Sequence, residues 1–297
     1  MSGALGRHFG SIGVALQEIY TQVTLSSASQ LQVSGASSER ALKITRQLCQ
    51  TLQVSDALAI RIDDAIPEHI GLGSGTQMAL AIGAALNAYY DLSLSVRDIA
   101  RLADRGARSG IGIGVFEQGG LVVDGGRGPQ TLTPPLLSRM PVPEDWRFIL
   151  VFDERGQGLH GEQEISAFRE LPPFPRHEAE RLCYLLLMQG LPALAEQNLT
   201  AFGEVISALQ DSVGQHFAPV QGGVFTSQPV AEAMAWLQQQ GAVAIGQTSW
   251  GPTGFCAVAN PVIADALLQD LQRHFVSHHL RFKIVSARNQ PAVCTAL

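Results

Sequence analysis

The sequence predicts a two-domain α+β protein, and three observations support this fold class. The chain has 297 residues, of which 46% are hydrophobic, enough to form a packed core in each of two domains. Strand-like runs and helical segments follow one another along both halves. A proline-rich passage, TPPLLSRMPVPEDW at 133–146, breaks this periodicity and is the best candidate for a linker. We therefore expect domains at residues 1–145 and 146–297.

The first domain is predicted to be a mixed α/β domain. Apolar and polar residues alternate in IYTQVTL and ALAIRID, which indicates two strands. Ser95, with Asp98 three residues later, predicts the start of a helix through a capping box. The expected elements are strands at 19–25 and 57–63 and helices at about 38–52, 74–88 and 95–104.

The second domain is predicted to be an α+β layer domain, because helices alternate there with well-spaced strands. The expected strands lie at 147–152, 242–246, 254–259 and 280–286. The expected helices lie at about 161–170, 176–188, 200–215, 229–240 and 261–275.

Composition excludes several classes of protein. The net charge of −6 argues against a nucleic-acid-binding surface. The apolar run from Met78 to Leu86 is too short to cross a bilayer, and the N-terminus lacks the regions of a signal peptide. We therefore expect a soluble, cytoplasmic protein with small-molecule substrates, no nucleic-acid or membrane partner, and a homodimeric state. Four widely separated cysteines are expected to be reduced thiols; they are Cys49, Cys183, Cys256 and Cys294.

The stretch GLGSGT at 71–76 predicts an anion-binding loop. Its three glycines directly precede an apolar helix, whose free N–H groups and positive dipole end favour a phosphate. The loop lacks the Gly-Lys-Ser/Thr of a P-loop and the spacing of a dinucleotide fingerprint. The alternative is a tight loop whose glycines only let the helix pack on a sheet. The candidate phosphate-binding residues are Gly71, Gly73, Ser74, Gly75, Thr76 and Gln77.

Three sequence blocks together resemble the GHMP-kinase superfamily: PEHIGLGSGTQMA at 67–79, RSGIGIGVFEQGGLVVDGG at 108–126 and QTSWGPTGF at 247–255. The resemblance implies a GHMP-kinase-like fold, with an N-terminal ribosomal-protein-S5-like α/β domain and a C-terminal ferredoxin-like α+β domain. Within the superfamily, the blocks look most like the β-ribofuranosylaminobenzene 5′-phosphate synthases, a non-kinase branch that serves methanopterin biosynthesis.

Position 112 separates this chain from the kinases of the superfamily. Mevalonate-kinase-like sequences read S-G-x-D in this block, and the aspartate is the base that activates the acceptor hydroxyl. Here Ser109-Gly110-Ile111 is followed by Gly112, so the carboxylate is missing. The loop also has Gly75-Thr76 where the kinases have a second serine and then alanine. Both departures argue against phosphoryl transfer.

The resemblance implies that phosphoribosyl diphosphate is joined to the carboxylate-bearing ring carbon of 4-aminobenzoate or 4-hydroxybenzoate, with release of diphosphate and carbon dioxide. The para substituent supplies electron density to that carbon, so no organic cofactor is required. We expect Mg²⁺ on the diphosphate. Two alternatives stay open: a GHMP-type small-molecule kinase that uses another carboxylate, and a non-catalytic phosphoribosyl- or nucleotide-binding protein.

Several polar residues are candidates for this chemistry. Arg7 lies in a block similar to the N-terminal block of the synthases and suits a phosphate or carboxylate, with His8 beside it as a possible general acid. Glu117 and Asp124 flank Gly119-Gly120 and are the expected magnesium ligands, although each is also suited to bracing turn amides. We expect Glu117 to be catalytic through the metal.

Further binding residues are expected around the three blocks. Trp250 is placed to stack on the aromatic ring while the backbone beside it binds the ring's carboxylate, with a core position as the alternative. Arg97, Arg101 and Arg105 are spaced four apart and are expected to form a solvated helix face, which leaves Arg108 as the better anion ligand. The remaining binding candidates are Ser109, Ser249, Gly251, Arg288 and Asn289.

Two other groups carry weaker signals. Glu162 and Glu164 stand near a predicted helix start, where acids also satisfy the helix dipole. His274, His278 and His279 include the spacing of a metal pair, but their place at a helix end favours a dipole interaction. Members of the family begin with a strand ahead of the Arg7 block, and this sequence starts almost at that block. We therefore expect a truncated start or a dispensable first strand, which puts any contribution of that strand to the pocket in doubt.

Overall fold

The computed structural model of the protein describes residues 5–155, 171–276 and 279–296. The chain forms two compact units, each assembled from more than one stretch of sequence. Unit 1 contains residues 1–8, 69–72 and 142–287. Unit 2 contains residues 9–68, 73–141 and 288–297.

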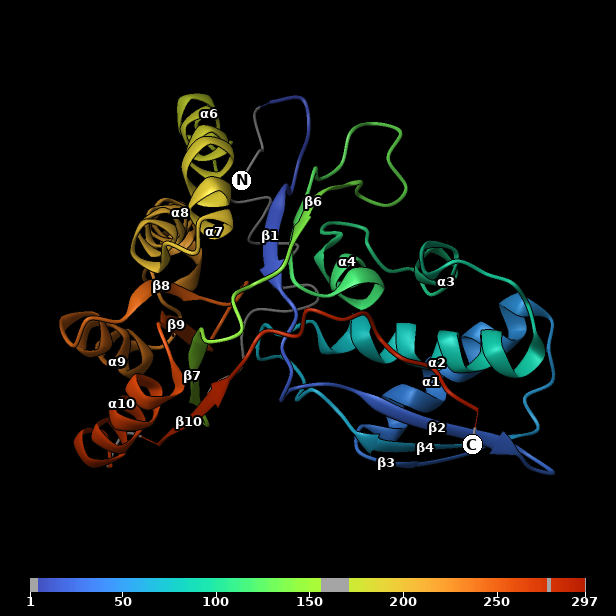
Figure 1. Cartoon of the computed structure of the whole chain (residues 1–297). Coiled ribbons are helices and arrows are strands. Elements are labelled where there is room, and N and C mark those ends of the chain that lie inside the picture. Colours follow the sequence, from blue (N-terminus) through green and yellow to red (C-terminus); the bar gives the residue numbers. More distant parts are fainter. Residues whose placement is uncertain (1–4, 156–170, 277–278, 297) are drawn as a thin grey trace. The chain divides into compact units, whose positions relative to one another are not determined.

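In unit 2, two helices cover a three-stranded sheet with the order β2-β4-β3 (Figure 1). Strand β2 (Gln22–Ser27) is antiparallel to β4 (Leu58–Asp64), whereas β3 (Gln32–Gly35) is parallel to it. The parallel pair needs a crossover, and α1 (Ser38–Leu52) supplies it. Helix α2 (Ser74–Tyr90) packs beside α1. Their shared core includes Leu48, Ile60, Met78 and Ile82.

A second part of unit 2 is an antiparallel sheet with the order β1-β5-β6. Its strands are β1 (Ser11–Val14), β5 (Leu121–Asp124) and β6 (Leu136–Met140). Helix α4 (Ile111–Gln118) contacts this sheet and α2, and α3 (Val96–Leu102) contacts both helices. Glycines permit the close approach, because a Cβ on Gly13 would lie 2.3 Å from the Ile111 side chain.

In unit 1, the sheet order β10-β7-β9-β8 and the succession β-α-β-β-α-β define a ferredoxin-like arrangement. All neighbouring strands are antiparallel. The strands are β7 (Arg147–Asp153), β8 (Val243–Gln247), β9 (Gly254–Val258) and β10 (Leu280–Val285). Helices α9 (Gln228–Gln239) and α10 (Pro261–His274) share a buried core with the sheet.

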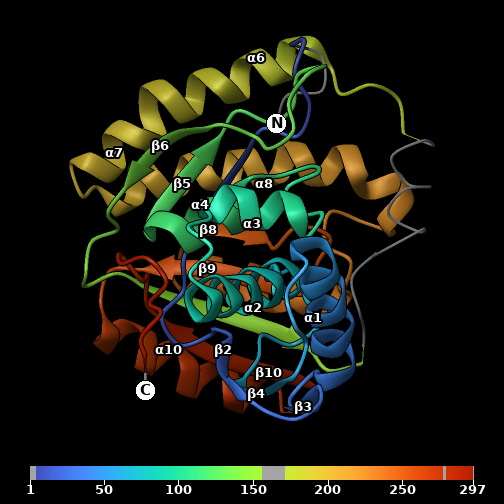
Figure 2. The same ribbon diagram turned by 90° about the vertical axis from the view of Figure 1, so that its right-hand side faces the viewer.

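The described part of unit 1 also contains α6 (Arg176–Leu185), α7 (Leu191–Ala195) and α8 (Leu199–Gln221), with a π-helical turn, η1 (Leu186–Gly190), between α6 and α7. Helix α8 packs on β8, where a Cβ on Gly203 would lie 2.4 Å from Val243. Figure 2 shows α8 and α10 on opposite sides of the sheet. The ferredoxin-like sheet of unit 1 is therefore covered on both faces.

Most expected elements are present with bounds within a few residues, and α1 matches its predicted range. Strand β6 lies inside the proline-rich passage that we expected to be a linker. The expected helix at 161–170 lies outside the described residues. The short strands β1, β3 and β5 and helix α4 were not predicted.

Two findings bear on the general class of the protein. No helix among the described residues is both long enough and apolar enough to cross a membrane. All four cysteines are free, as expected; Cys49 and Cys256 are buried, and Cys183 and Cys294 are exposed. Burial raises the pKa of Cys256 to about 12, so this thiol has little nucleophilic character.

Candidate functional site

The predicted phosphate loop ends at the start of helix α2. Gly73 is the N-cap of α2 in a left-handed conformation with φ of 71°, and no side chain caps the helix there. The first N–H groups of a helix have no intrahelical acceptors, so this end presents donors and the positive end of the dipole. A Cβ at Gly73 would meet no heavy atom within 4 Å, which leaves open space beside the loop. This geometry suits a phosphoryl group.

The first half of the loop is held by the second glycine block within unit 1. The hydroxyls of Thr248 and Thr253 donate hydrogen bonds to the carbonyl oxygen of Ile70 at 3.1 and 2.8 Å. Gly71 has φ of +76°, and a Cβ there would lie 2.4 Å from the Thr248 carbonyl oxygen. Gly71 therefore permits a close contact with the Thr248 backbone. For this glycine, the structure supports the alternative that loop glycines serve packing.

Two arginines that lie far apart in the sequence converge at the start of α2. Arg40, from the first turn of α1, donates from Nη1 to the Ser74 hydroxyl at 3.2 Å. A Cβ placed on Gly75 would lie 3.5 Å from Arg105 Nη1 and 3.8 Å from Arg40 Nη1. The two guanidinium groups therefore lie beside Gly75 at the helix N-terminus. We refer to Arg40 and Arg105 as the arginine pair.

Arg105 was expected on a solvated helix face, and this prediction is wrong. Helix α3 ends at Leu102, and the left-handed residues Asp104 and Gly106 redirect the chain, so Arg105 is not on the α3 face. The Arg105 Nε atom is buried and has no hydrogen-bond partner among the described residues. Burial lowers the pKa of Arg105, and the positive charge of Arg40 lowers it further.

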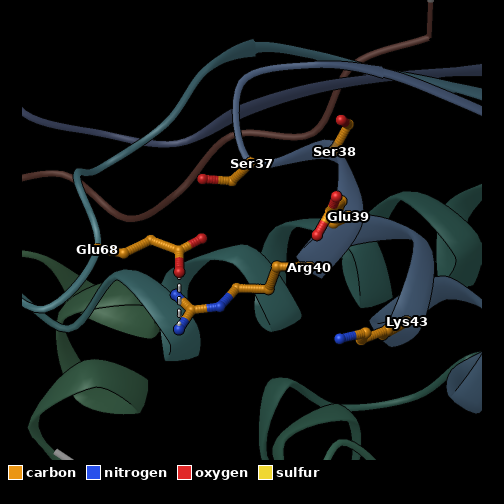
Figure 3. Close-up of a pocket in the computed structure, with 6 residues that line it drawn as sticks. All are labelled: Ser37, Ser38, Glu39, Arg40, Lys43 and Glu68. Atoms are coloured by element: carbon orange, nitrogen blue, oxygen red, sulfur yellow. Dashed lines mark ion pairs between the residues drawn. The ribbon is translucent and has the colours of Figure 1, made fainter.

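A polar pocket adjoins Arg40 in unit 2, with a volume of about 440 Å³. Figure 3 shows the Arg40 side chain reaching across the pocket to Glu68, and their ion pair measures 3.2 Å. Arg40 thus uses one nitrogen toward Glu68 and another toward Ser74. The residues that line the pocket are Ser37, Ser38, Glu39, Arg40, Lys43 and Glu68.

The glycine block at 108–120 forms a helix rather than a loop. Helix α4 lies against α2, and a Cβ on Gly112 would lie 2.8 Å from Thr76 Cγ2. The side-chain amide of Gln77 donates to the Gly112 carbonyl at 2.7 Å. Gly112 is thus a packing position, and Thr76 fills the space that a side chain at 112 would need.

Asp124 organises the backbone at the start of α4. It is 2% exposed, and its Oδ2 accepts hydrogen bonds from the Gly110 N–H at 2.8 Å and the Ser109 hydroxyl at 3.1 Å. Its Oδ1 accepts from the Gly126 N–H at 2.7 Å. Both carboxylate oxygens are engaged by the protein, which does not fit a magnesium ligand.

Glu117 also makes a protein contact rather than facing the α2 N-terminus. Its carboxylate lies 3.4 Å from Arg97 Nη2, with both side chains partly exposed. Glu117 lies five residues after Gly112 in α4, so it stands about 7.5 Å farther along the helix axis than the position that contacts Thr76. No group of three or more His, Cys, Asp or Glu side chains suited to a metal ion exists among the described residues. The metal-binding role of Glu117 stays a prediction.

The C-terminal segment packs against the end of α4 in unit 2. The carbonyl of Arg288 accepts from the Gly120 N–H at 2.7 Å, and Arg139 donates to the Asn289 carbonyl. The Arg288 guanidinium donates to the carbonyl of Pro291 at 2.9 Å. The C-terminal segment is therefore joined to the glycine block through Gly120 and to β6 through Arg139.

Trp250 is buried in the core, which was the alternative to stacking on an aromatic substrate. It is 8% exposed, and its ring lies 4.6 Å from that of Phe217 in an edge-on arrangement. Ser249 and Gly251 on either side both have positive φ. Arg7 and His8 belong to unit 1 and Arg108 to unit 2, and all three have interactions within the described structure. The roles of these residues stay predictions. Glu162, Glu164 and His278 lie outside the described residues.

The main residue that sequence reasoning missed is Arg40. Its sequence context is an ordinary polar first helical turn, and nothing in it signals contact with Ser74. For Arg105 a signal existed: Asp104 and Gly106 flank it, and such residues favour left-handed backbone that ends a helix. A helix that ends before residue 105 would have separated Arg105 from the solvated face.

Comparison with protein families agrees with this architecture. Residues 39–119 match the family model for the GHMP kinases N terminal domain, and residues 191–277 match the GHMP kinases C terminal model. The homoserine kinase structure from Cytophaga hutchinsonii superposes with a TM-score of 0.66 at 15% identity, covering 98% of this chain and 92% of that one. Mevalonate kinase from L. major gives 0.66 at 15% identity, covering 97% and 94%. The fold is that of the GHMP-kinase superfamily.

Curated relatives identify the branch. Beta-ribofuranosylphenol 5′-phosphate synthase from Archaeoglobus fulgidus is 32% identical over 223 residues, 71% of each chain. Synthases of the same name from Methanocaldococcus jannaschii and Methanothermobacter thermautotrophicus are 32% and 27% identical, over 71% and 85% of this chain and 72% and 82% of theirs. The chain belongs to this family of synthases, which is a family of enzymes.

Proposed function

We propose that the protein joins phosphoribosyl diphosphate to a para-substituted benzoate and releases carbon dioxide and diphosphate, as a step of methanopterin biosynthesis. The observation that carries the proposal is the contact between Gly112 and Thr76. In the related kinases this position holds the base, whereas here the space is filled and no carboxylate stands there. A reaction that needs no base at this place suits the site.

The proposed reaction balances without a proton acceptor at position 112. The C1–O bond of the ribose breaks, and its electron pair leaves with the diphosphate. The ring carbon that bears the carboxylate forms the new bond to C1 with a π-electron pair of the ring. The bond to the carboxylate then breaks, and its electron pair restores the aromatic ring as carbon dioxide departs. The protein's task is to bind the anions, exclude water and orient the ring.

The start of α2 provides the anion binding in this proposal. The N–H groups after Gly73 and the Ser74 hydroxyl face a phosphoryl group, and the helix dipole favours its charge. Charge on the departing diphosphate grows during the reaction, so fixed donors at this point favour the transition state. We propose that any Mg²⁺ enters with the diphosphate, because Mg²⁺ is commonly held by substrate phosphates with few protein ligands.

The aromatic acceptor is proposed to be 4-hydroxybenzoate or 4-aminobenzoate. The relatives are named for a ribofuranosylphenol product, and a phenol hydroxyl in the product requires a hydroxyl on the acceptor. This name favours the hydroxy compound. Equal concentrations of both acids in one reaction, with the two products separated by chromatography, would decide between them.

The direct test incubates the purified protein with phosphoribosyl diphosphate, Mg²⁺ and carboxyl-labelled acceptor. We expect release of labelled carbon dioxide and diphosphate in equal amounts. Ser74→Asp, which puts a negative charge beside the proposed phosphate site, is the matched inactive variant. Absence of both products from the folded wild-type protein would reject the proposal. ATP-dependent phosphorylation of an alcohol would favour a kinase, and tight substrate binding without turnover would favour a binding protein.

A further inference from the structure

We propose that Arg40 and Arg105 together bind the diphosphate group of the donor at the N-terminus of α2. This inference rests on the proposed function for the identity of the donor. It adds two ligands that lie outside the three sequence blocks, one on α1 and one beyond the end of α3. Both arginines and the start of α2 belong to unit 2.

The first support is convergence. Nη1 of each arginine lies within 4 Å of one point, the position of a Cβ on Gly75. Both guanidinium groups therefore lie beside Gly75, in the first turn of α2. Arg40 is held there from both sides, by Glu68 at 3.2 Å and by the Ser74 hydroxyl at 3.2 Å. The site is therefore preorganised on one side by an existing ion pair.

The second support is the electrostatic cost of the arrangement. Two like charges and the positive end of a helix dipole repel one another, and a buried Nε without a partner adds a desolvation cost. The lowered pKa of Arg105 has the same causes, burial first and Arg40 second. A bound anion between the two guanidinium groups would offset the repulsion that remains beside the Arg40–Glu68 ion pair, so the arrangement favours anion binding.

The third support concerns which anion fits. A guanidinium presents forked donors that bind phosphoryl oxygens in pairs. Two guanidiniums on separate elements provide two such forks, and a diphosphate has two linked phosphoryl centres. A single 5′-phosphate would use one fork and leave the other fork without a phosphoryl partner. We therefore assign the arginine pair to the diphosphate rather than to the 5′-phosphate.

Calorimetric titration in EDTA with inorganic pyrophosphate and with ribose 5-phosphate tests the assignment. Arg40→Gln and Arg105→Gln should each weaken pyrophosphate binding by about 10- to 100-fold, the usual effect of losing a charged hydrogen bond. Ribose 5-phosphate binding should change less than threefold in both. Arg101→Gln is the matched control, because Arg101 is exposed and forms its ion pair with Asp98, away from the start of α2. Arg105→Lys keeps the charge without the fork and should fall between.

Thermal unfolding distinguishes a ligand-binding role of Arg105 from a role in stabilising the fold. If Arg105 is a ligand, Arg105→Gln should leave the melting temperature of the free protein unchanged or raised, because it removes repulsion and a buried charge. A lowered melting temperature with unchanged pyrophosphate affinity would overturn the inference. Loss of ribose 5-phosphate binding in place of pyrophosphate binding would overturn the assignment to the diphosphate.

These measurements do not depend on turnover. Suppose that the wild-type protein makes no product, but that Arg40→Gln and Arg105→Gln lose pyrophosphate binding. That result would reject the proposed reaction and support the arginine pair as an anion site. Alternatively, the wild-type protein makes product, and wild type, Arg105→Gln and Arg101→Gln all bind pyrophosphate equally well. That result would support the proposed reaction and reject the arginine pair as its diphosphate site.

Discussion

The Asp124 carboxylate accepts a hydrogen bond from the backbone N–H of Gly110 at 2.8 Å, which ties the end of β5 to the start of α4. Asp124→Asn replaces one acceptor oxygen with a donor, which would face either the Gly126 N–H or the Gly110 N–H and the Ser109 hydroxyl. Because the site is buried, we expect the unfolding free energy to fall by about 1–3 kcal/mol. Urea denaturation in EDTA measures this effect. Unchanged stability, with activity restored by added Mg²⁺, would instead support a metal ligand.

The contact between Gly112 and Thr76 predicts a coupled pair of substitutions. Gly112→Ala places a methyl group 2.8 Å from Thr76 Cγ2 and should cost about 1–3 kcal/mol of stability. In a Thr76→Ser background the Cγ2 atom is absent, so the same substitution should cost less. A double-mutant cycle by chemical denaturation measures the difference. Equal costs in the two backgrounds would show that α4 shifts freely away from α2.

The two loop glycines are expected to respond differently to alanine. Both have positive φ, so each alanine pays the left-handed backbone cost of about 1–2 kcal/mol. Only Gly71→Ala also meets the Thr248 carbonyl, whereas Gly73→Ala projects into open space. Calorimetry should therefore find the lower melting temperature for Gly71→Ala, with Gly73→Ala acting mainly on pyrophosphate affinity. Similar melting temperatures would contradict the Thr248 contact.

Glu117→Gln tests whether this carboxylate binds a metal or pairs with Arg97. The ion pair is partly exposed, so its loss should lower stability by at most about 1 kcal/mol and leave pyrophosphate affinity in EDTA unchanged. Turnover should fall less than tenfold at all Mg²⁺ concentrations. Arg97→Gln, which breaks the same pair from the other side, should match it. A fall of about 10²–10³ in Glu117→Gln alone, recovered by raised Mg²⁺, would place a metal there.

Asp153 predicts a loss of stability in acid. Burial acts to raise the pKa of Asp153, but hydrogen bonds from Arg155 and Ser227 outweigh it and hold the pKa below its usual value. A carboxyl whose folded pKa is depressed stabilises the fold above the unfolded pKa, about 3.9, and loses this contribution as the pH falls toward the folded value.

The difference in melting temperature between wild type and Asp153→Asn should therefore be constant above about pH 5 and shrink below about pH 4. Val262→Ala, which changes an exposed apolar side chain and no titratable group, serves as the pH control. A difference that stays constant to pH 2 would show that Asp153 contributes through packing rather than charge.

The main elements of the fold were predictable because their patterns are local. The helix expected at 74–88 is α2, which ends at Tyr90, and its small apolar residues allow close packing against α1 and α4. Helix α4 was missed because Ile111-Gly112-Ile113-Gly114 has two poor helix formers. Its glycines are favourable only in the folded chain, where Thr76 and Leu136 approach them.

The candidate site was predictable only in part. The glycines of the loop predict that the backbone can closely approach a ligand or another segment. In the structure the loop leads into the N-terminus of α2, as expected. The arginine pair depends on tertiary contacts between residues 40, 75 and 105, which no local pattern encodes. Asp124 shows the converse case: a carboxylate beside glycines suggested a metal ligand, yet its oxygens accept backbone and hydroxyl hydrogens.

The tight packing of Thr76 on Gly112 also limits which sequences can be reached from this one by single changes. Placing an aspartate at 112 first requires a smaller residue at 76, because its Cβ would otherwise lie 2.8 Å from Thr76 Cγ2. Shrinking residue 76 alone leaves a gap between two helices and brings no new chemistry. Each single step is therefore disfavoured, so an aspartate at 112 requires two coupled substitutions rather than one.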